Sequence, residues 1–380
     1  MTDITNIQMV NLGSQYHHIK EELDAALINC LESTAFINGP AVKEFQKNLE
    51  TYLGVKNDIP CANGTDALQI AMMALGLKRG DEVIVPSFTY VATAEVIALL
   101  GLKPVMVDCD ADSFNITADI IEKAITPKTK AIVPVHLFGQ SADMDAIMAV
   151  ANAHNLWVIE DNAQAIGADY LSKDGVKRKA GTIGHVGCTS FFPSKNLGCY
   201  GDGGALMTND DALATKIRMI ANHGQKQQYL HSVIGVNSRL DSLQAVILNI
   251  KLRHLDAYCD ARRKAADYYD AAFKDIESLQ TPVRSRHSTH VFHQYTMRVK
   301  NNQRADLQAY LKTQGIPSMI YYPVPLYKQE AFETYVEKGF SLPITEGLCQ
   351  EVLSLPVHTE MDEPLLHYIS EHVRRFFLNT

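Results

Sequence analysis

Residues 190–204 read SFFPSKNLGCYGDGG, and this stretch carries the strongest chemical signal in the chain. A short apolar run over residues 188–192 stops at Pro193, and Lys195 follows within a turn. Glycines then become frequent, at positions Gly198, Gly201, Gly203 and Gly204. At this density the backbone can adopt positive φ angles and come close to whatever the loop surrounds. A lone lysine is most often a solvated surface charge, but this one lies between an apolar strand and a glycine-rich loop. We therefore predict that Lys195 is a Schiff-base lysine that carries a cofactor aldehyde.

The composition points away from nucleic-acid and membrane partners. With 380 residues the chain exceeds one ordinary domain. Its formal net charge of −8 is spread along the sequence, whereas a nucleic-acid footprint needs a basic face. The one short basic cluster, residues 177–179, is better explained as a solvated hairpin tip. No apolar run reaches the ~18 residues of a membrane span, and the N-terminal residues do not read as a signal peptide.

Cysteines and histidines give no metal signature. The 7 cysteines are odd in number and scattered without a CxxC pair, as expected of reduced thiols in the cytoplasm. The 14 histidines show neither an HExxH motif nor a paired-ligand spacing. We therefore predict a cytoplasmic protein without a metal site.

Hydrophobic periodicity predicts an α/β architecture in the first two thirds of the chain. Helices are expected at residues 16–31, 41–53, 65–75, 89–100, 118–125, 144–154 and 211–221. Short apolar strands are expected at residues 59–62, 82–86, 103–107, 131–135, 156–160 and 205–208. Short apolar strands that alternate with helices of this length predict a mostly parallel sheet, covered by helices on both faces.

The pattern of predicted secondary structure changes towards the C-terminus. Two long helices are expected at residues 242–255 and 259–273. Beyond them follow an alternating, antiparallel-like strand, a helix, a proline-dotted loop and a last helix, at residues 291–299, 305–314, 320–326 and 364–377. We predict a large α/β domain over residues 1–255 and a smaller α+β domain over residues 256–380.

Two polar motifs follow predicted strands. Residues 63–66, NGTD, close a strand and open a helix, and a helix N-terminus is a natural phosphate seat. Thr65 or Asp66 could equally act as an ordinary cap of its own helix. Asp161 follows another strand, at the edge where open α/β sheets bind ligands. It either caps a following turn or holds a pyridine nitrogen protonated, which makes the ring an electron sink.

Tyr90 adds a third position at a strand end. An aromatic residue there is most often part of the core, but it can also stack on a planar cofactor. The candidate phosphate seat, stacking ring, acidic partner, hydroxyl and lysine all follow predicted parallel strands, in the order Gly64 and Thr65, Tyr90, Asp161 and Gln164, Ser190, Lys195. Pyridoxal 5′-phosphate (PLP) requires this set of groups, and five independent coincidences are a poor alternative. We predict a PLP enzyme.

Five segments carry a family resemblance. They are NGTDAL (63–68), PSFTYVAT (86–93), EDNAQAIGA (160–168), SFFPSKNLGCYGDGGA (190–205) and GVNSRLDSLQAVIL (235–248). Together they resemble the nucleotide-sugar aminotransferases of the DegT/StrS type, which are fold-type-I PLP enzymes. The resemblance runs from about residue 8 to near the C-terminus. It implies a large domain with a mostly parallel sheet between helices, plus a smaller C-terminal domain.

The resemblance also implies roles for individual residues. Lys195 would form the Schiff base and shuttle the proton, and Asp161 would pair with the pyridine nitrogen. Around the ring, Gln164 would contact the hydroxyl, while Tyr90 and Ala163 would cover the two faces. The implied phosphate ligands are Gly64, Thr65, Ser190 and, from the neighbouring subunit of a homodimer, Asn237.

Within the family, the likeness is greatest to 3-aminotransferases that act on UDP-2-acetamido-2-deoxy-3-dehydro-D-glucuronate with L-glutamate as donor. These enzymes serve bacterial surface polysaccharide (O-antigen) synthesis. Arg239 would grip a carboxylate, and Tyr321 and Tyr322 would contact the substrate. Asn196 and Tyr321 depart from the pattern, which has proline and histidine at these positions.

Four other functions compete. A PLP-dependent sugar dehydratase would have histidine in place of Lys195. A non-catalytic PLP-binding regulator would need a DNA-binding module, for which the chain has neither spare length nor basic charge. A Rossmann oxidoreductase would need a glycine-rich fingerprint after its first strand, and CANGTDAL is not one. Amination at C4 of a UDP-4-keto-6-deoxy-amino sugar is the alternative among aminotransferases.

Overall fold

The computed structural model describes residues 6–378 and is built around a seven-stranded sheet. The strand order is β1-β9-β8-β5-β4-β2-β3. The strands are β1 (Asn57–Cys61), β2 (Glu82–Pro86), β3 (Lys103–Val107), β4 (Thr129–Ile132), β5 (Trp157–Asp161), β8 (Val186–Ser190) and β9 (Gly204–Thr208). Five neighbours, from β8 to β3, run parallel, and β9 alone is antiparallel to both strands beside it. The predicted mostly parallel sheet is confirmed.

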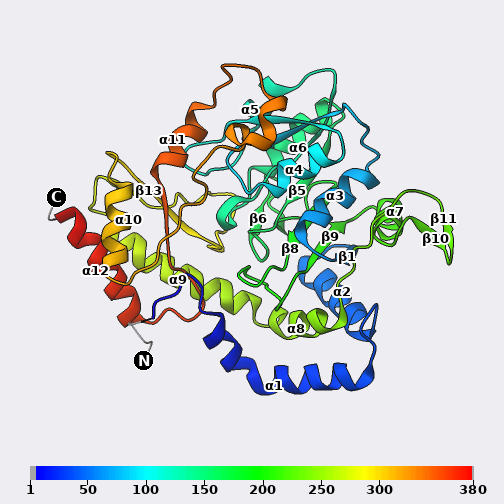
Figure 1. Cartoon of the computed structure of the whole chain (residues 1–380), viewed down its shortest axis with the longest axis horizontal. Helices are drawn as coiled ribbons and strands as arrows, with labels where there is room; N and C mark the ends of the chain where they lie inside the picture. Colours follow the sequence, from blue (N-terminus) through cyan, green and yellow to red (C-terminus); the bar gives the residue numbers. More distant parts are fainter. Residues whose placement is uncertain (1–5, 379–380) are drawn as a thin grey trace.

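Helices cover both faces of this sheet (Figure 1). The flanking helices are α2 (Pro40–Leu53), α3 (Gly64–Ala74), α4 (Ala92–Leu99), α5 (Ala118–Ala124), α6 (Met144–Ala153), α7 (Asp211–Ala221) and α8 (Ser242–Leu252). Side chains of β2 show why both faces are apolar. Val83 and Val85 join the core formed with α3, α4 and α7, whereas Ile84 joins the core formed with α5 and α6. A strand buried on both faces reads as a continuous apolar run.

The C-terminal part has its own antiparallel sheet and core. Its strands are β12 (Leu279–Gln280), β13 (Tyr295–Val299) and β14 (Val352–Leu355), in that order. Its helices are α9 (Leu255–Phe273), α10 (Arg304–Thr313), α11 (Pro343–Glu351) and α12 (Glu363–Leu378). Tyr269, Met297 and Ile369 lie in one core cluster, which Ile7 from the N-terminal segment also joins. The division into domains 1–255 and 256–380 stays a prediction.

The remaining elements extend from the two cores. Helix α1 (Leu12–Ser33) packs along α8 (Figure 1). Two hairpins are formed by β6 (Asp169–Leu171) with β7 (Lys177–Lys179), and by β10 (Gln225–Gln227) with β11 (Leu230–His231). Short 3-10 turns are η1 (Leu137–Gly139), η2 (Leu326–Lys328) and η3 (Glu330–Tyr335). The basic cluster of residues 177–179 lies on the first hairpin, where Lys177 and Lys179 both pair with Asp169. The second hairpin projects from the body and was not predicted.

Two predicted elements begin later than expected. The strand predicted from Val291 starts only at Tyr295, because Phe292 has a φ of 45° and the Val291 carbonyl accepts a hydrogen bond from the Asn196 side chain. The helix predicted from Thr89 starts at Ala92. Over residues 6–378, no helix is long and apolar enough to cross a membrane, and no group of three His, Cys, Asp or Glu side chains could hold a metal ion.

Candidate active site

The glycine-rich loop after β8 folds back against its own strand. Phe191 is buried, its amide donates to the Gly203 carbonyl at 2.7 Å, and its carbonyl accepts from the Cys199 amide at 2.8 Å. The glycines serve close packing here, and none of those at positions 198–204 has a positive φ, contrary to our expectation. A Cβ on Gly198 would lie 2.3 Å from the Pro193 oxygen. The loop therefore closes tightly around Lys195.

The N-terminus of α3 meets the end of β8. Asn63 caps the helix by accepting the Asp66 amide at 2.7 Å, so neither Thr65 nor Asp66 is the cap. Within residues 6–378, the Thr65 side chain makes no hydrogen bond of its own. A Cβ on Gly64 would lie only 2.7 Å from the Ser190 Cβ. This juxtaposition leaves free amides, a hydroxyl and a helix N-terminus at one point, which suits a phosphate group.

Asp161 ends β5 as a nearly buried carboxylate with 6% exposure. Its Oδ2 accepts a hydrogen bond of 2.9 Å from Thr93 Oγ1, and its Oδ1 accepts one of 3.1 Å from the Ala163 amide. The hydrogen bond from the Ala163 amide is the turn cap that is the alternative to a ligand role for Asp161. Burial raises the pKa of Asp161, while these hydrogen bonds and the charge of Lys195 act in the opposite direction.

Lys195 is partly buried, and its amine is free. In the part of the chain that the structure describes, Nζ forms neither a hydrogen bond nor an ion pair, although the backbone amide donates to the Phe192 carbonyl at 2.8 Å. Burial lowers the pKa of Lys195 to about 8, and the negative charge of Asp161 acts against this shift. A lysine with such a pKa is partly neutral near neutral pH and can act as a nucleophile or base.

Asn196, one of the two departures from the family pattern, has a structural use. It is buried, and its Nδ2 donates to the Val291 carbonyl at 2.8 Å. Proline has no side-chain donor, so it could not form this bond. The residue after the reactive lysine is thereby tied to the segment that leads into β13.

Gln164 and three tyrosines form a connected group near the end of β5. The amide of Gln164 accepts from the Phe138 backbone at 2.7 Å and donates to the Tyr322 hydroxyl at 3.1 Å. The Tyr322 ring lies 6.4 Å from the ring of Tyr90, which is 58% exposed. Tyr90 is therefore not a core residue, and its ring is open to a planar ligand. Tyr321 lies next to Tyr322 with a ring separation of 6.1 Å.

Asn237 and Arg239 lie on the chain that returns from the projecting hairpin. Asn237 is exposed, and within residues 6–378 its side chain forms no hydrogen bond with the Gly64–Ser190 site. Arg239 donates to the Asn222 side chain at 3.2 Å and, among the described residues, has no carboxylate partner. Ser238 between them is buried and accepts the Ala62 amide at 3.0 Å. Among the described residues, no hydrogen bond thus ties the Asn237 side chain to the phosphate seat of its own chain.

Sequence reasoning missed several residues of this site. Thr93 lies within the quoted PSFTYVAT segment, one turn after Tyr90, but no rule singled it out from other helical threonines. His136 and Glu160 form a buried pair directly behind Asp161, at 2.8 Å. Ser238 anchors the loop beside Asn237. None of these contacts has a sequence signature, because each joins positions far apart in the chain.

The groups brought together fit pyridoxal phosphate. The Gly64–Ser190 cradle, which any side chain at position 64 would fill, suits the phosphate. The buried Asp161 carboxylate suits a protonated ring nitrogen, the exposed Tyr90 ring suits stacking, and the free amine of Lys195 suits an aldehyde. The chemistry of this donor set is that of a PLP site.

Comparisons with known proteins agree. The DegT/DnrJ/EryC1/StrS aminotransferase family model matches residues 17–374. The chain is 48% identical to a UDP-2-acetamido-2-deoxy-3-oxo-D-glucuronate aminotransferase of Pseudomonas aeruginosa, over 94% of this chain and 96% of the relative. It is 46% identical to a "pleiotropic regulatory protein" of Geobacillus stearothermophilus (98% and 99% covered). It is 44% identical to a UDP-N-acetyl-3-dehydro-α-D-glucosamine 3-aminotransferase of Acidithiobacillus ferrooxidans (99% of both).

Solved structures show the same fold. A DegT/DnrJ/EryC1/StrS aminotransferase of Brucella abortus superposes with a TM-score of 0.92 at 42% identity, covering 98% of this chain and all of the other. NtdA of Bacillus subtilis, solved with the bound cofactor PMP, superposes with a TM-score of 0.91 at 30% identity, covering 99% and 86%. Together with the site geometry, these findings confirm that the chain belongs to the DegT/DnrJ/EryC1/StrS aminotransferase family and is a pyridoxal 5′-phosphate-dependent aminotransferase.

Proposed function

We propose that this enzyme transfers an amino group from L-glutamate to C3 of a UDP-linked 3-keto-2-acetamido sugar, the glucuronic acid, for bacterial surface polysaccharide (O-antigen) synthesis. The observation that carries the reaction type is the free amine of Lys195 beside the buried Asp161 carboxylate. The sugar rests on two relatives at 48% and 44% identity, whose names both specify a 3-keto amino sugar linked to UDP. The seven cysteines are all unpaired, which supports a cytoplasmic location.

In this proposal, residues of one subunit hold four parts of the cofactor: its phosphate, the two faces of its ring, its ring hydroxyl and its ring nitrogen. Gly64, Thr65 and Ser190 bind the phosphate at the N-terminus of α3. Tyr90 covers one face of the ring and Ala163 the other. Gln164 contacts the ring hydroxyl with the amide that also holds Tyr322. Asp161, held by Thr93, keeps a proton on the ring nitrogen.

The chain's own residues move the protons. When bound, PLP supplies an aldehyde that takes up the amino group and a ring that stabilises negative charge on the neighbouring carbon. Lys195 Nζ, neutral in part because burial lowers its pKa to about 8, removes the proton from Cα of glutamate. It then delivers a proton to the cofactor carbon. With the keto-sugar, the same amine moves the proton in the opposite direction and places it on C3.

Substrate carboxylates need a cation, and Arg239 offers one. Among the described residues its guanidinium has no acidic partner, and its one hydrogen bond there is to the neutral Asn222 side chain. A planar guanidinium binds a carboxylate with two parallel hydrogen bonds. We assign the glutamate carboxylate, and in the second half of the reaction the uronate carboxylate, to this residue. Tyr321 and Tyr322 contribute neutral hydroxyls to the sugar.

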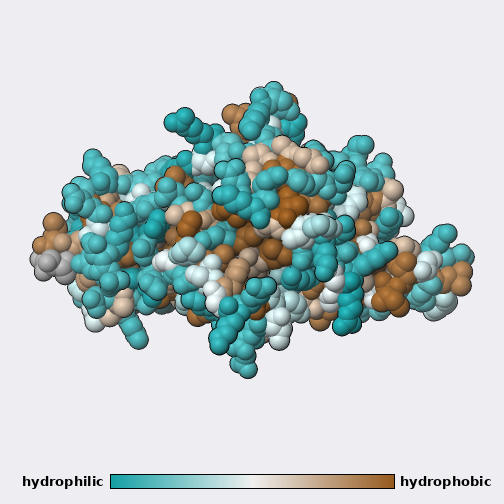
Figure 2. Space-filling model, turned by 90° about the horizontal axis from the view of Figure 1, so that it is seen from above, coloured by the Kyte–Doolittle hydropathy of each residue, from teal (hydrophilic) through white to brown (hydrophobic). Residues whose placement is uncertain are grey.

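A homodimer completes the site in this proposal. Asn237 is exposed and, within the described residues, forms no hydrogen bond with the phosphate seat of its own chain, so in this proposal it serves the seat of the neighbouring subunit. The adjoining hairpin bears exposed apolar side chains, namely Tyr229, Leu230, Val233 and Ile234. Figure 2 shows apolar atoms at the end of the molecule where Figure 1 places this hairpin. Exposed apolar side chains on a projecting arm favour burial against a second copy.

A direct assay tests the substrate. The purified enzyme receives glutamate and, separately, UDP-linked 3-keto-glucuronate, 3-keto-glucosamine and 4-keto-6-deoxy-amino sugars, and 2-oxoglutarate release is measured. We expect the highest kcat/KM with the 3-keto-glucuronate. Preference for the 3-keto-glucosamine would retain C3 and reject the uronate. Preference for the 4-keto sugar would reject C3, and binding of PLP without any turnover would favour a regulatory role like the name of the Geobacillus relative.

A further inference from the structure

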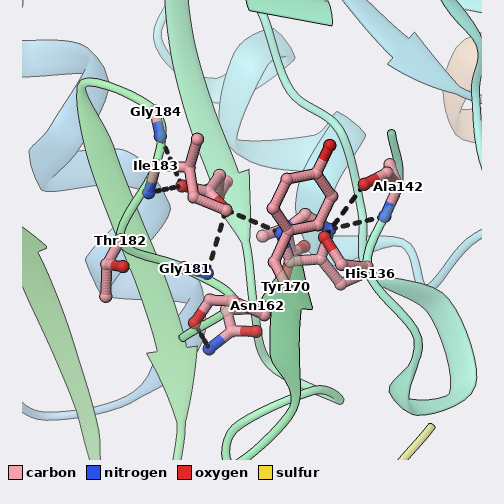
Figure 3. Close-up of polar contacts among 12 residues, drawn as sticks. His136, Ala142, Asn162, Tyr170, Gly181, Thr182, Ile183 and Gly184 are labelled. Atoms are coloured by element: carbon pink, nitrogen blue, oxygen red, sulfur yellow. Dashed lines mark hydrogen bonds and ion pairs between the residues drawn. The ribbon is translucent and has the colours of Figure 1, made fainter. Parts of the chain in front are cut away.

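A second buried carboxylate lies directly before Asp161, and the mechanism above does not use it. Glu160 on β5 is fully buried. Its Oε1 accepts the backbone amides of Ile183 at 2.6 Å and Gly184 at 2.5 Å, and its Oε2 accepts the Gly181 amide at 2.9 Å. Figure 3 shows Gly181, Ile183 and Gly184 on one side of this carboxylate and His136 on the other. Together with His136, these amides give each of the two carboxylate oxygens of Glu160 two hydrogen-bond partners.

His136 provides the fourth donor, and its neighbours indicate the hydrogen-bonding role of each ring nitrogen. Its Nδ1 accepts the Ala142 amide at 3.3 Å, so this nitrogen carries no proton. Its Nε2 lies 2.8 Å from Glu160 Oε2 and carries the proton that it donates. The ring is fully buried, and Figure 3 shows it held between Ala142 and the carboxylate. The His136 ring is thus held in one orientation by contacts at both of its nitrogens.

The two segments tied to Glu160 also hold the residues that follow it. On one side, the His136 amide donates to the Asp161 carbonyl at 3.0 Å, and the Phe138 amide donates to Gln164 Oε1 at 2.7 Å. On the other side, Asn162 Nδ2 donates to the Ala180 carbonyl at 3.0 Å, next to Gly181. A single carboxylate therefore joins the segments that place Asp161, Asn162 and Gln164.

We propose that Glu160 and His136 are positioning residues that hold Asp161 and Gln164 in the orientation needed at the cofactor ring. The inference rests on the proposed roles of Asp161 and Gln164. If the pair only stabilised the fold, its loss would lower the unfolding temperature without a specific effect on the cofactor. As a positioning pair, it controls how tightly and in which protonation state the cofactor ring is bound.

The variant Glu160→Gln distinguishes a positioning role of the pair from a purely structural one. Glu160→Gln keeps the shape but replaces one acceptor oxygen by an NH2 group that faces backbone N–H donors. The matched control is Glu82→Gln, because Glu82 is also buried on a sheet strand but begins β2, at the opposite edge, where Lys103 contacts it at 3.1 Å. Binding of pyridoxamine 5′-phosphate is measured by equilibrium dialysis, and unfolding temperature is measured on the cofactor-free proteins.

We expect Glu160→Gln to raise the dissociation constant of pyridoxamine phosphate by about tenfold, the equivalent of one lost charge-assisted hydrogen bond. Glu82→Gln should lower the unfolding temperature and leave the dissociation constant within about twofold of wild type. With bound PLP, the pH midpoint of the visible absorption band should rise in Glu160→Gln only. A ring nitrogen that has lost its proton no longer repels a proton on the Lys195 nitrogen.

Two His136 variants give an independent answer if Glu160→Gln does not fold. The amide nitrogen of His136→Gln can reach the place of Nε2 and donate to Glu160, whereas that of His136→Asn cannot. Pyridoxamine phosphate affinity closer to wild type in His136→Gln than in His136→Asn supports the proposal. Equal affinities in these two variants, or equal effects of Glu160→Gln and Glu82→Gln, overturn it. Failure of the wild-type enzyme to bind the cofactor would instead refute the proposed function.

Discussion

Thr93 Oγ1 lies 2.9 Å from Asp161 Oδ2, and this bond joins the first turn of α4 to the carboxyl end of β5. It is a direct side-chain link between two βα units whose strands, β2 and β5, are separated in the sheet by β4, at the edge of the candidate cofactor site. It lowers the pKa of Asp161, which burial raises.

Replacing Thr93 by valine should weaken the pairing of Asp161 with the ring nitrogen. The variant keeps the branched shape and loses the donor, so the pKa of Asp161 should rise further. We expect kcat to fall by about tenfold, as for the loss of a hydrogen bond to a charged group. Thr93→Ser retains a hydroxyl and should stay near wild type. If steady-state kinetics gave equal losses for both variants, the bond would have no catalytic role.

The glutamate half-reaction should depend on pH through Lys195. Its amine must be neutral to remove a proton, and burial lowers its pKa to about 8. The single-turnover rate should therefore rise with pH below that value and level off above it. Stopped-flow absorbance of the bound cofactor measures this rate. Lys195→Ala should lose both the borohydride-sensitive yellow chromophore and multiple turnover. A rate that falls as pH rises through 8 would exclude Lys195 as the base.

Gly204 should not tolerate a side chain, although its φ is not in the left-handed region. A Cβ there would lie 2.4 Å from the backbone carbon of Asn63, the cap of α3. Gly204→Ala should therefore destabilise the protein by about 1–3 kcal/mol and weaken phosphate binding, because it pushes the α3 N-terminus away.

The matched control for this substitution is Gly347→Ala in α11. Apart from its chain neighbours and the backbone of its own helix, no heavy atom of the described residues lies within 4 Å of its added Cβ, so the helix should gain about 0.5–1 kcal/mol. Urea unfolding measures both variants, and PLP titration measures the cofactor affinity. If Gly204→Ala were as stable as Gly347→Ala, β9 and the α3 cap could move apart without any loss of folding free energy, and the prediction would be wrong.

A charge on the projecting hairpin should dissociate the predicted dimer. Ile234 is 84% exposed, and Ile234→Asp would place a carboxylate in the proposed interface. Sedimentation velocity should show a monomer with reduced PLP affinity, because Asn237 of the second copy would be missing from the phosphate seat. Leu378→Asp changes a similarly exposed apolar residue on α12 and should remain dimeric. A stable Ile234→Asp dimer would place the interface elsewhere.

Removal of the Arg239 cation should raise the KM for glutamate. Arg239→Gln loses a guanidinium that has no acidic partner in the described chain. We expect kcat/KM for glutamate to fall by tenfold or more, since a hydrogen-bonded charge contributes about 1.5–3 kcal/mol. Arg253→Gln, which removes an exposed partner of Glu22, serves as control. Unchanged glutamate kinetics in Arg239→Gln would show that another residue binds the carboxylate of glutamate.

The sheet and the order of site residues could be read from the sequence, because both follow local rules. Apolar strands between helices predict a parallel sheet, and carboxyl ends of parallel strands share one edge. That reasoning places Gly64, Asp161 and Ser190 at one edge of the sheet from the sequence alone. It could not find Thr93 or the His136–Glu160 pair, whose contacts join distant positions through tertiary packing alone. The late start of the predicted strand at Tyr295 has the same cause, since the Asn196 side chain takes the Val291 carbonyl out of pairing.

The hydrogen bond from Asn196 to Val291 also couples the position of the Lys195 amine to the C-terminal part of the chain. Asn196 follows Lys195 directly, and Val291 leads into β13, which belongs to the C-terminal sheet. Any displacement of that sheet relative to the seven-stranded one must stretch this bond or carry the lysine with it. The position of Lys195 Nζ is thus coupled to the C-terminal half of the chain, and substitutions there can affect the proton transfer proposed for Lys195 through one hydrogen bond.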